Sequence, residues 1–318
     1  MADEVTVRPA TDDDIAEIID VAARALGWNP ADPNEAFFRW KHLENAAGRS
    51  PMWVAESGGE IAGFRSMMRW TYRDGERTLR AVRAVDTATD PNHQRKGIFR
   101  LLTEAAVDEL TVDGTDFVFN TPNEKSRPGY LRMGWIDAGR LPAAFLPAGP
   151  ASLLRLTRAR TAAEKWSLPL AAGEPIDAVA DDLAHANGGI PAAAGDSIAT
   201  DRTPAHLRWR YGFEPLHYRA IQTDEAIGVV RLRRRGPATE AVVADVASAS
   251  TKATRKLFAA IRRLDGVDYL LTLSSPPHPA PRLPTIPGLG PHLTLRDLAR
   301  PAPAAERFRF SLGDIELF

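Results

Sequence analysis

The spacing of apolar and polar residues predicts a strand and an amphipathic helix at the start of the chain. Residues 5–8 alternate between apolar and polar side chains, as a half-buried strand does. From Ile15 to Leu26, apolar residues recur at helical spacing. Thr11 is a suitable N-cap for this helix, and the aspartates that follow it lie where the helix dipole favours negative charge. Gly27 is expected to end the helix.

The pattern then changes to that of strands. Residues 52–56 and 60–70, joined by a turn at residues 57–59, predict a β-hairpin, and residues 80–89 predict a further strand. A helix over residues 98–110, a strand over 117–120, a short helix and a last strand beginning at Gly134-Trp135 follow. An antiparallel meander with one βαβ unit predicts an α/β (α+β) fold, with a mixed, mostly antiparallel twisted sheet flanked by helices.

The second half of the chain repeats features of the first half more faintly. Residues 141–150 are rich in Pro, Ala and Gly, so we expect two domains, residues 1–145 and 146–318. Segments 39–42, 61–64, 84–86 and 116–119 resemble segments 208–211, 226–229, 244–246 and 268–271, in the same order. This order favours a duplicated domain, with two similar but unrelated α/β domains as the alternative. Residues 308–318 alternate as a strand does.

Composition and charge exclude several classes of function. The formal net charge of -1 gives no overall field that would attract nucleic acid or an acidic membrane. The run of Arg231, Arg233, Arg234 and Arg235 is expected on a solvated strand face. The absence of cysteine excludes disulfides and a thiol nucleophile, and the histidines show no metal-binding spacing. Without a signal pattern or a membrane-length apolar run, we expect a cytoplasmic protein with no metal, membrane or nucleic-acid partner.

A basic loop connects the strand over residues 80–89 to the helix over residues 98–110. It contains Gln94, Arg95, Lys96 and Gly97. The first backbone N–H groups of a helix lack helical partners, and with the helix dipole they bind phosphate groups. Gly97 lets the backbone approach an anion closely, and the basic side chains add positive charge. From these residues alone, a helix N-terminus with exposed basic side chains is an equal alternative.

This loop resembles the pyrophosphate-binding motif of the GNAT acetyltransferase superfamily. Gln94 and Gly97 match the pattern Gln/Arg-x-x-Gly-x-Gly/Ala, whereas Phe99 stands at its last position. A second segment is similar to the family's Asn-x-x-Ala…Tyr-x-x-x-Gly-Phe: Asn123 and Tyr130 keep the spacing and Gly134-Trp135 follows. The resemblance covers about residues 3–140 and implies the acyl-CoA N-acyltransferase fold, with acetyl-CoA as co-substrate and no metal.

The resemblance also implies roles for individual residues. Tyr130 is expected to protonate the departing thiolate, because a phenol is protonated at neutral pH and can donate to sulfur. The pantetheine arm is expected to contact Asn123 and to pair with the backbone of residues 87–89 as a strand would. The implied acyl-CoA contacts are Thr87, Ala88, Thr89, Gln94, Arg95, Lys96, Gly97, Ile98, Phe99, Asn123 and Ser126.

The sequence leaves open which group accepts the proton of the amine. Asp86, on the strand before the basic loop, is the first candidate for this catalytic role. A water relay, His42, Asp314, Glu316 and the terminal carboxylate are alternatives. Trp40, Trp53 and Trp70 are expected either in an acceptor cleft or in the core.

The expected reaction is direct attack of an amine on the thioester of acetyl-CoA. The acceptor would be a small-molecule amine, an amino sugar or a peptide. The second domain lacks a glycine-containing basic loop after residue 246, so we expect it to shape the acceptor site or to form a homodimer interface. A non-catalytic acyl-CoA sensor or scaffold, which Phe99 favours, stays open. A Fem-type aminoacyl transferase also stays open, although the near-neutral charge argues against binding of tRNA.

Overall fold

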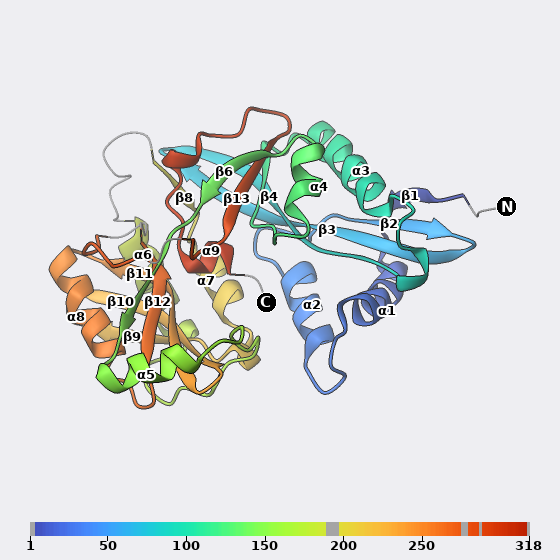
Figure 1. The fold of residues 1–318 in the computed structure, drawn as a ribbon. Coiled ribbons are helices and arrows are strands. Elements are labelled where there is room, and N and C mark those ends of the chain that lie inside the picture. Colours follow the sequence, from blue (N-terminus) through green and yellow to red (C-terminus); the bar gives the residue numbers. More distant parts are fainter. Residues whose placement is uncertain (1–3, 189–196, 275–278, 286–287, 317–318) are drawn as a thin grey trace. The chain divides into compact units, whose positions relative to one another are not determined.

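The chain forms two compact units (Figure 1). The computed structural model describes residues 4–188, 197–274, 279–285 and 288–316. The first unit consists of Met1–Tyr72, Thr78–Gly139 and His292–Pro303, and the second consists of Arg73–Arg77, Arg140–Pro291 and Ala304–Phe318. Residues 292–303, which the expected boundary at residue 145 assigns to the second domain, thus lie in the first unit.

The first unit is built on a mixed sheet with the strand order β1-β2-β3-β4-β5-β13-β6. Its strands are β1 (Thr6–Pro9), β2 (Met52–Ser57), β3 (Glu60–Asp74), β4 (Arg77–Thr89), β5 (Phe117–Asn120), β6 (Ile136–Arg140) and β13 (His292–Asp297). β1 and β2, β2 and β3, and β5 and β13 pair antiparallel, whereas β4 and β5 run parallel. The predicted fold class, a mixed and mostly antiparallel sheet with flanking helices, is confirmed.

Helices cover both faces of this sheet (Figure 1). On one face lie α3 (Ile98–Val112) and α4 (Arg127–Arg132), and on the other lie α1 (Ile15–Leu26) and α2 (Asn34–Leu43). Val82 and Val118 of the sheet pack in the same apolar cluster as α3, and Val54 and Phe64 pack in that of α1. The three candidate tryptophans are buried and belong to the core: Trp40, Trp53 and Trp70.

Local polar contacts explain where the first helix begins and ends. A short 3-10 turn, η1 (Asp12–Asp14), precedes α1. The backbone N–H of Thr11 donates to the carboxylate of Asp14 at 2.6 Å, and Gly27 ends the helix with a left-handed φ of 65°. A second such turn, η2 (Pro91–His93), precedes the basic loop. Thr11 therefore caps the 3-10 turn, whereas the N-cap of α1 itself is Asp14; the predicted stop at Gly27 is confirmed.

The second unit has a sheet of its own, with the strand order β7-β12-β11-β10-β9. The strands of this sheet are β7 (Ala143–Pro147), β9 (Arg219–Thr223), β10 (Ala226–Arg235), β11 (Ala238–Ser248) and β12 (Tyr269–Leu273). The unit also contains the short strand β8 (Ile198–Thr200), which is not part of this sheet. Its helices and turns are α5 (Pro150–Arg158), α6 (Ile176–Gly188), α7 (Pro204–Tyr211), η3 (Glu214–Leu216), α8 (Thr251–Ile261), η4 (Ala305–Arg307) and α9 (Leu312–Ile315). Val243 and Leu270 of the sheet pack with Leu257 and Phe258 of α8.

Each of the two sheets contains a short stretch of parallel pairing. In the first unit, residues 81–83 of β4 pair with residues 117–119 of β5. In the second unit, residues 240–242 of β11 pair with residues 269–271 of β12. In both units the parallel pairing of these two strands extends over three residues, although β4 and β11 continue beyond it.

A second correspondence lies just beyond this pairing. In the first unit, the carboxylate of Asp86 on β4 is bonded to His42 of α2. In the second unit, the carboxylate of Asp245 on β11 accepts a hydrogen bond from the hydroxyl of Tyr211 of α7 at 3.3 Å. Both contacts join segments that recur in the sequence, which supports the predicted duplication.

Two expectations for the second unit are wrong. Leu312–Ile315 forms the helix α9 rather than a strand, because the backbone N–H of Ser311 donates to Asp314 at 2.7 Å in a capping box. Arg231 lies in the core rather than on a solvated face, and its Nη2 pairs with Glu316 at 2.5 Å. Alternation alone does not distinguish an exposed arginine from one buried with an anion. Within the described ranges, no helix has the length and apolar character needed to cross a membrane.

Candidate functional site

The end of β4 has a free edge on the side of β5. Parallel pairing stops at Arg83, which lies opposite Phe119, so residues 84–89 of β4 have no β5 residue beside them in the register. The other edge of β4 stays attached to β3. The N–H of Asp90 donates to the carbonyl of Ala62 at 2.9 Å, and the hydroxyl of Thr87 donates to the carbonyl of Phe64 at 3.0 Å. The free backbone groups at residues 84–89 can therefore pair with an extended ligand.

Asp86 interrupts the regular alternation of β4. Its φ of 26° is uncommon for a residue other than glycine. Before it, Ala84 packs in the cluster of α3, and after it, Ala88 packs in the cluster of α1. The carboxylate of Asp86 reaches α2, where it is bonded to His42 Nε2 at 2.7 Å and forms an ion pair with Lys41. The irregular backbone thus directs this carboxylate toward α2.

Lys41 and His42 determine the charge of Asp86. Burial alone would raise the pKa of Asp86, but the charge of Lys41 and the hydrogen bond from His42 outweigh burial and hold that pKa well below its usual range. Burial lowers the pKa of His42 below its ordinary value, although Asp86 opposes this effect. We therefore infer an ionised Asp86 beside a neutral His42 that carries its hydrogen on Nε2. The other ring nitrogen, Nδ1, then accepts a hydrogen bond from the hydroxyl of Ser50 at 2.9 Å.

The basic loop presents backbone donors at the start of α3. Arg95 and Gly97 both have left-handed φ values, 65° and 77°. Such alternating backbone conformations turn successive N–H groups toward one side and form a concave anion site. In the described part of the chain, no protein acceptor bonds the N–H groups of residues 94–99, and the side chains of Arg95 and Lys96 are exposed beside them. The loop therefore has the donors and the charge that a pyrophosphate needs.

Tyr130 lies in α4 with a buried side chain. Nη2 of Arg65, on β3, donates to the phenol oxygen at 2.8 Å. The ring of Phe99 packs edge-on against that of Tyr130, with ring centroids 5.4 Å apart. Across the residues that the structure describes, no group accepts the phenol's own hydrogen. The hydroxyl of Tyr130 is thus held through its oxygen and is available to donate.

Asn123 and Ser126 have a local structural role at the start of α4. Oδ1 of Asn123 accepts hydrogen bonds from the N–H groups of Lys125 at 3.0 Å and Ser126 at 2.9 Å. The hydroxyl of Ser126 also donates to Oδ1 of Asn123, at 3.1 Å. The amide nitrogen of Asn123 is not used in this turn. The contacts of Asn123 and Ser126 with acyl-CoA stay predictions.

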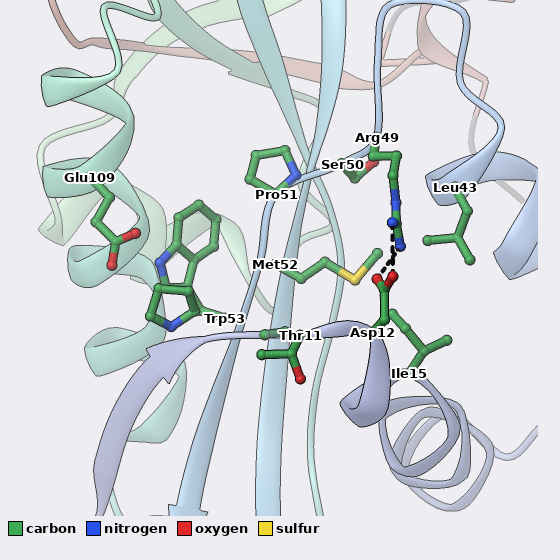
Figure 2. Close-up of a pocket in the computed structure, with 12 residues that line it drawn as sticks. Thr11, Asp12, Ile15, Leu43, Arg49, Ser50, Pro51, Met52, Trp53 and Glu109 are labelled. Atoms are coloured by element: carbon green, nitrogen blue, oxygen red, sulfur yellow. Dashed lines mark hydrogen bonds and ion pairs between the residues drawn. The ribbon is translucent and has the colours of Figure 1, made fainter.

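A pocket of about 290 Å³ lies elsewhere in the first unit (Figure 2). Its wall contains no member of the predicted acyl-CoA site. Figure 2 shows two of its lining residues, Arg49 and Asp12, facing each other and joined by an ion pair at 2.6 Å. Ser50, the partner of His42, also lines this pocket. His42 therefore connects the pocket wall to Asp86 through two hydrogen bonds.

The remaining candidates for the base have partners in the second unit. Asp314 pairs with Arg202 at 3.0 Å, and Glu316 pairs with Arg231. The terminal carboxylate belongs to residue 318, outside the described residues. Among the residues that the structure describes, no cluster of three or more His, Asp or Glu side chains could hold a metal ion.

Our interpretation of the sequence missed Arg65 and Lys41. Arg65 is the one basic residue in the apolar stretch of residues 61–68, and this isolation was the available signal. Its contact with Tyr130 depends on packing between segments 65 residues apart, which a local pattern does not contain. Lys41 precedes a candidate base, His42, but its pairing with Asp86 likewise depends on the packing of α2 on the sheet.

Comparison with known proteins agrees with this geometry. Three solved structures share the fold over most of the chain. The first is a conserved protein of unknown function from Enterococcus faecalis V583, named as a probable N-acyltransferase, with a TM-score of 0.67 and 10% identity over 93% of this chain and 73% of that chain. The second is a GCN5-related N-acetyltransferase from Anabaena variabilis, with a TM-score of 0.65 and 13% identity over 93% of this chain and 73% of that chain. The third is a GCN5-related N-acetyltransferase from Kribbella flavida, with a TM-score of 0.62 and 15% identity over 94% of this chain and 72% of that chain. At these identities the likeness concerns the fold. No curated protein matches the sequence.

The fold is therefore the one seen in solved N-acetyltransferases. Residues 6–137 match the sequence model of the acetyltransferase (GNAT) domain. This match lies within the first unit, and the predicted resemblance to the GNAT superfamily is confirmed.

Proposed function

We propose that the first unit binds acetyl-CoA and transfers its acetyl group to an amine. The observation that carries this proposal is the edge of β4 at residues 84–89, beyond its pairing with β5, followed directly by the loop at residues 94–99, whose N–H groups have no acceptor among the described residues. An extended pantetheine arm can pair with the first, and the pyrophosphate can bind the second. The GNAT domain match covers both segments.

Each part of the predicted acyl-CoA site has a distinct task in this proposal. The backbone of Thr87, Ala88 and Thr89 pairs with the pantetheine arm. Gln94, Arg95, Lys96, Gly97, Ile98 and Phe99 surround the pyrophosphate through their N–H groups, with charge from the basic side chains. The amide nitrogen of Asn123 donates to the arm, and Ser126 holds Asn123 in place.

Transfer begins when the amine nitrogen attacks the thioester carbonyl carbon. A C–N bond forms, the C–S bond breaks, and sulfur leaves with the electron pair. Tyr130 donates its hydroxyl proton to this sulfur, and the phenol later regains a proton from water. The amine loses one proton in the same sequence. The products are the N-acetylated amine and CoA with a free thiol.

Asp86 has a more limited task in this proposal than that of a strong base. Because Lys41 and His42 hold its pKa well below the usual range, Asp86 keeps its negative charge but has little tendency to retain a proton. An anion of this kind attracts the protonated form of an amine and orients it. Water takes one proton from this ammonium, which frees the lone pair for attack, and the neutral amine loses its second proton during transfer.

Calorimetry with acetyl-CoA tests the location of the site. Lys96→Glu should weaken binding about tenfold or more, because it removes a positive charge beside the pyrophosphate and adds a negative one. Lys252→Glu is the matched control, since Lys252 is exposed in the first turn of α8, the corresponding helix of the second unit. Equal weakening by both variants, or no binding by the wild type, would refute the assignment to the first unit.

A screen of amines with acetyl-CoA, read by release of free thiol, tests the reaction itself. Amino sugars, small amines and peptide N-termini are the acceptor classes to include. Acceptor-dependent thiol release by the wild type, reduced strongly by Tyr130→Phe, supports the transferase function. Acetyl-CoA binding without turnover on any acceptor would favour a sensor.

A further inference from the structure

Arg65 carries a buried charge that the protein does not neutralise. Its side chain is 0% exposed, and in the described part of the chain it forms no ion pair. Nη2 donates to the phenol oxygen of Tyr130 at 2.8 Å, whereas Nε and Nη1 have no acceptor among the described residues. A guanidinium normally enters a protein core with a carboxylate partner or several acceptors.

Aromatic rings supply the remaining stabilisation of this cation. The guanidinium carbon lies 5.2 Å from the ring centroid of Tyr130 and 5.6 Å from that of Phe99. Ring faces attract a cation, but less strongly than a carboxylate does. A methionine would fill much of the same space without any desolvation cost. Within the described ranges, the resting protein therefore offers no negative charge to match that of Arg65.

A negative charge arises beside Arg65 during the proposed reaction. When the C–S bond breaks, sulfur takes the electron pair, and when Tyr130 gives its proton to sulfur, the phenol oxygen keeps the O–H electron pair. Nη2 already points at that oxygen in the resting state. A donor arranged before the charge appears stabilises the transition state more than the ground state.

We propose that Arg65 is a positioning residue for Tyr130, which it holds through the phenol oxygen while its charge stabilises the departing thiolate and the phenolate. This inference rests on the proposed acetyl transfer. The bond to Arg65 leaves the phenol hydrogen free for sulfur, so position and proton donation are set by one contact.

Phe99, which departs from the family motif, fits this arrangement. Its ring contacts both Tyr130 and Arg65, and a Cβ added at Gly129 would lie only 3.3 Å from Phe99 Cε1. A small residue at position 99 would leave the space between α3 and α4 open. The ring fills this space and keeps water from Arg65, which strengthens the effect of its charge.

Binding of CoA and desulfo-CoA, in which hydrogen replaces the thiol, tests the contact with sulfur without any acceptor. The wild type should prefer CoA, and the preference should grow to about tenfold as the pH rises from 7 to 9, where a thiol of ordinary pKa of about 8.5 ionises. Arg65→Met should reduce this preference to less than about twofold with desulfo-CoA affinity kept, and Arg65→Lys should restore part of it.

Arg83→Met is the matched control for loss of a buried arginine. Arg83 is also almost fully buried, on the neighbouring strand β4, but its Nη2 donates to Thr121 rather than to Tyr130. This variant should lower stability and keep the pH-dependent preference for CoA. Retention of the preference in Arg65→Met would show that Arg65 only fills the core. If the wild type binds neither CoA nor desulfo-CoA, the proposed function fails, and this inference fails with it.

Kinetics with acetyl-CoA and the amine found in the screen give an independent test. Arg65→Met should lower kcat about 10²-fold and leave KM for acetyl-CoA within about threefold, because the charge acts mainly in the transition state. Tyr130→Phe should cost much less in the Arg65→Met background than in the wild type, since the two residues act as one unit. If the two substitutions instead lower kcat independently, so that their fold-changes multiply in the double variant, the proposal is overturned while acetyl transfer itself stands.

Discussion

Gly63 lies where β3 passes closest to the end of β4, and an alanine there would disturb the proposed acyl-CoA edge. An added Cβ would lie 2.8 Å from the carbonyl oxygen of Ala88, 2.9 Å from Cγ2 of Ile98 and 3.4 Å from Cα of Thr89. Ordinary Cβ contacts are longer, and the nearest atom belongs to the backbone, which cannot rotate away. Relief of the contact requires β4 and the first turn of α3 to shift by a few tenths of an ångström.

The expected cost of Gly63→Ala follows from this overlap. Inserting a methyl group into a packed core costs about 1–3 kcal/mol. Because alanine restricts the unfolded chain more than glycine does, the substitution also raises the free energy of unfolding by about 0.4–1 kcal/mol. The central values give a net loss of about 1.3 kcal/mol, which corresponds to a Tm lower by roughly 3–5 °C for a unit of this size. Because the displaced groups belong to the free edge of β4, acetyl-CoA should also bind on the order of tenfold more weakly.

Gly228→Ala is the matched control, because Gly228 holds the corresponding position on β10. Its added Cβ would meet only side-chain atoms of α8, with Cδ2 of Leu257 at 3.0 Å as the nearest. Thermal denaturation and calorimetry of both variants separate the effects. Gly63→Ala should weaken acetyl-CoA binding, whereas Gly228→Ala should leave it within about twofold. Unchanged binding in Gly63→Ala, despite lower stability, would show that the end of β4 does not hold the ligand.

Three further predictions concern buried charges. Asp86→Asn should lower the free energy of unfolding in urea by about 3 kcal/mol, because it leaves the charge of Lys41 unpaired. A second substitution, Lys41→Met, should recover part of this loss. Equal stability of Asp86→Asn and the wild type would refute the prediction. Folded-state pKa values of His42 and Asp86 lie below their ordinary values, so the unfolded chain binds more protons and stability should decrease on acidification. The His42 contribution is complete above about pH 6.5 and is lost below it, and the Asp86 contribution is lost below about pH 4; the Asp86→Asn variant should lack only the lower phase. Arg202→Met should cost about 3–5 kcal/mol in unfolding free energy, because Arg202 pairs with two buried carboxylates, and a cost near zero would contradict this.

Local patterns were enough to predict most elements of the first unit. The strand at residues 117–120, the turn at 57–59 and the cap at Thr11 depend on neighbours in sequence, and the structure contains each of them. The strand β13 was missed because six residues between proline-rich stretches give a weak signal, and its partner β5 lies more than 170 residues earlier. Pairing across such a distance leaves no trace in local periodicity.

The candidate site, too, could be predicted from the sequence only in part. The basic loop and the Asn123–Tyr130 spacing are short motifs, so their positions next to β4, α3 and α4 could be predicted. The environment of Asp86 could not, because its pKa depends on Lys41 and His42 of another element. Arg65 and Tyr130 likewise meet only after β3 and α4 have packed together. Motifs located the site, whereas tertiary packing sets the charges within it.

The position of β13 has a consequence for the order in which the protein can fold during its synthesis. β13 lies between β5 and β6, with Thr294 opposite Asn120, so the sheet of the first unit is complete only when residues 292–297 have left the ribosome. Until then, the buried strand β5 has an unpaired edge, which is a template for aggregation. The first unit of the nascent chain therefore remains only partly folded during the synthesis of about 170 further residues. A fragment ending near residue 145 would stay at that stage permanently, and would resemble an arrested folding intermediate more than a free-standing domain.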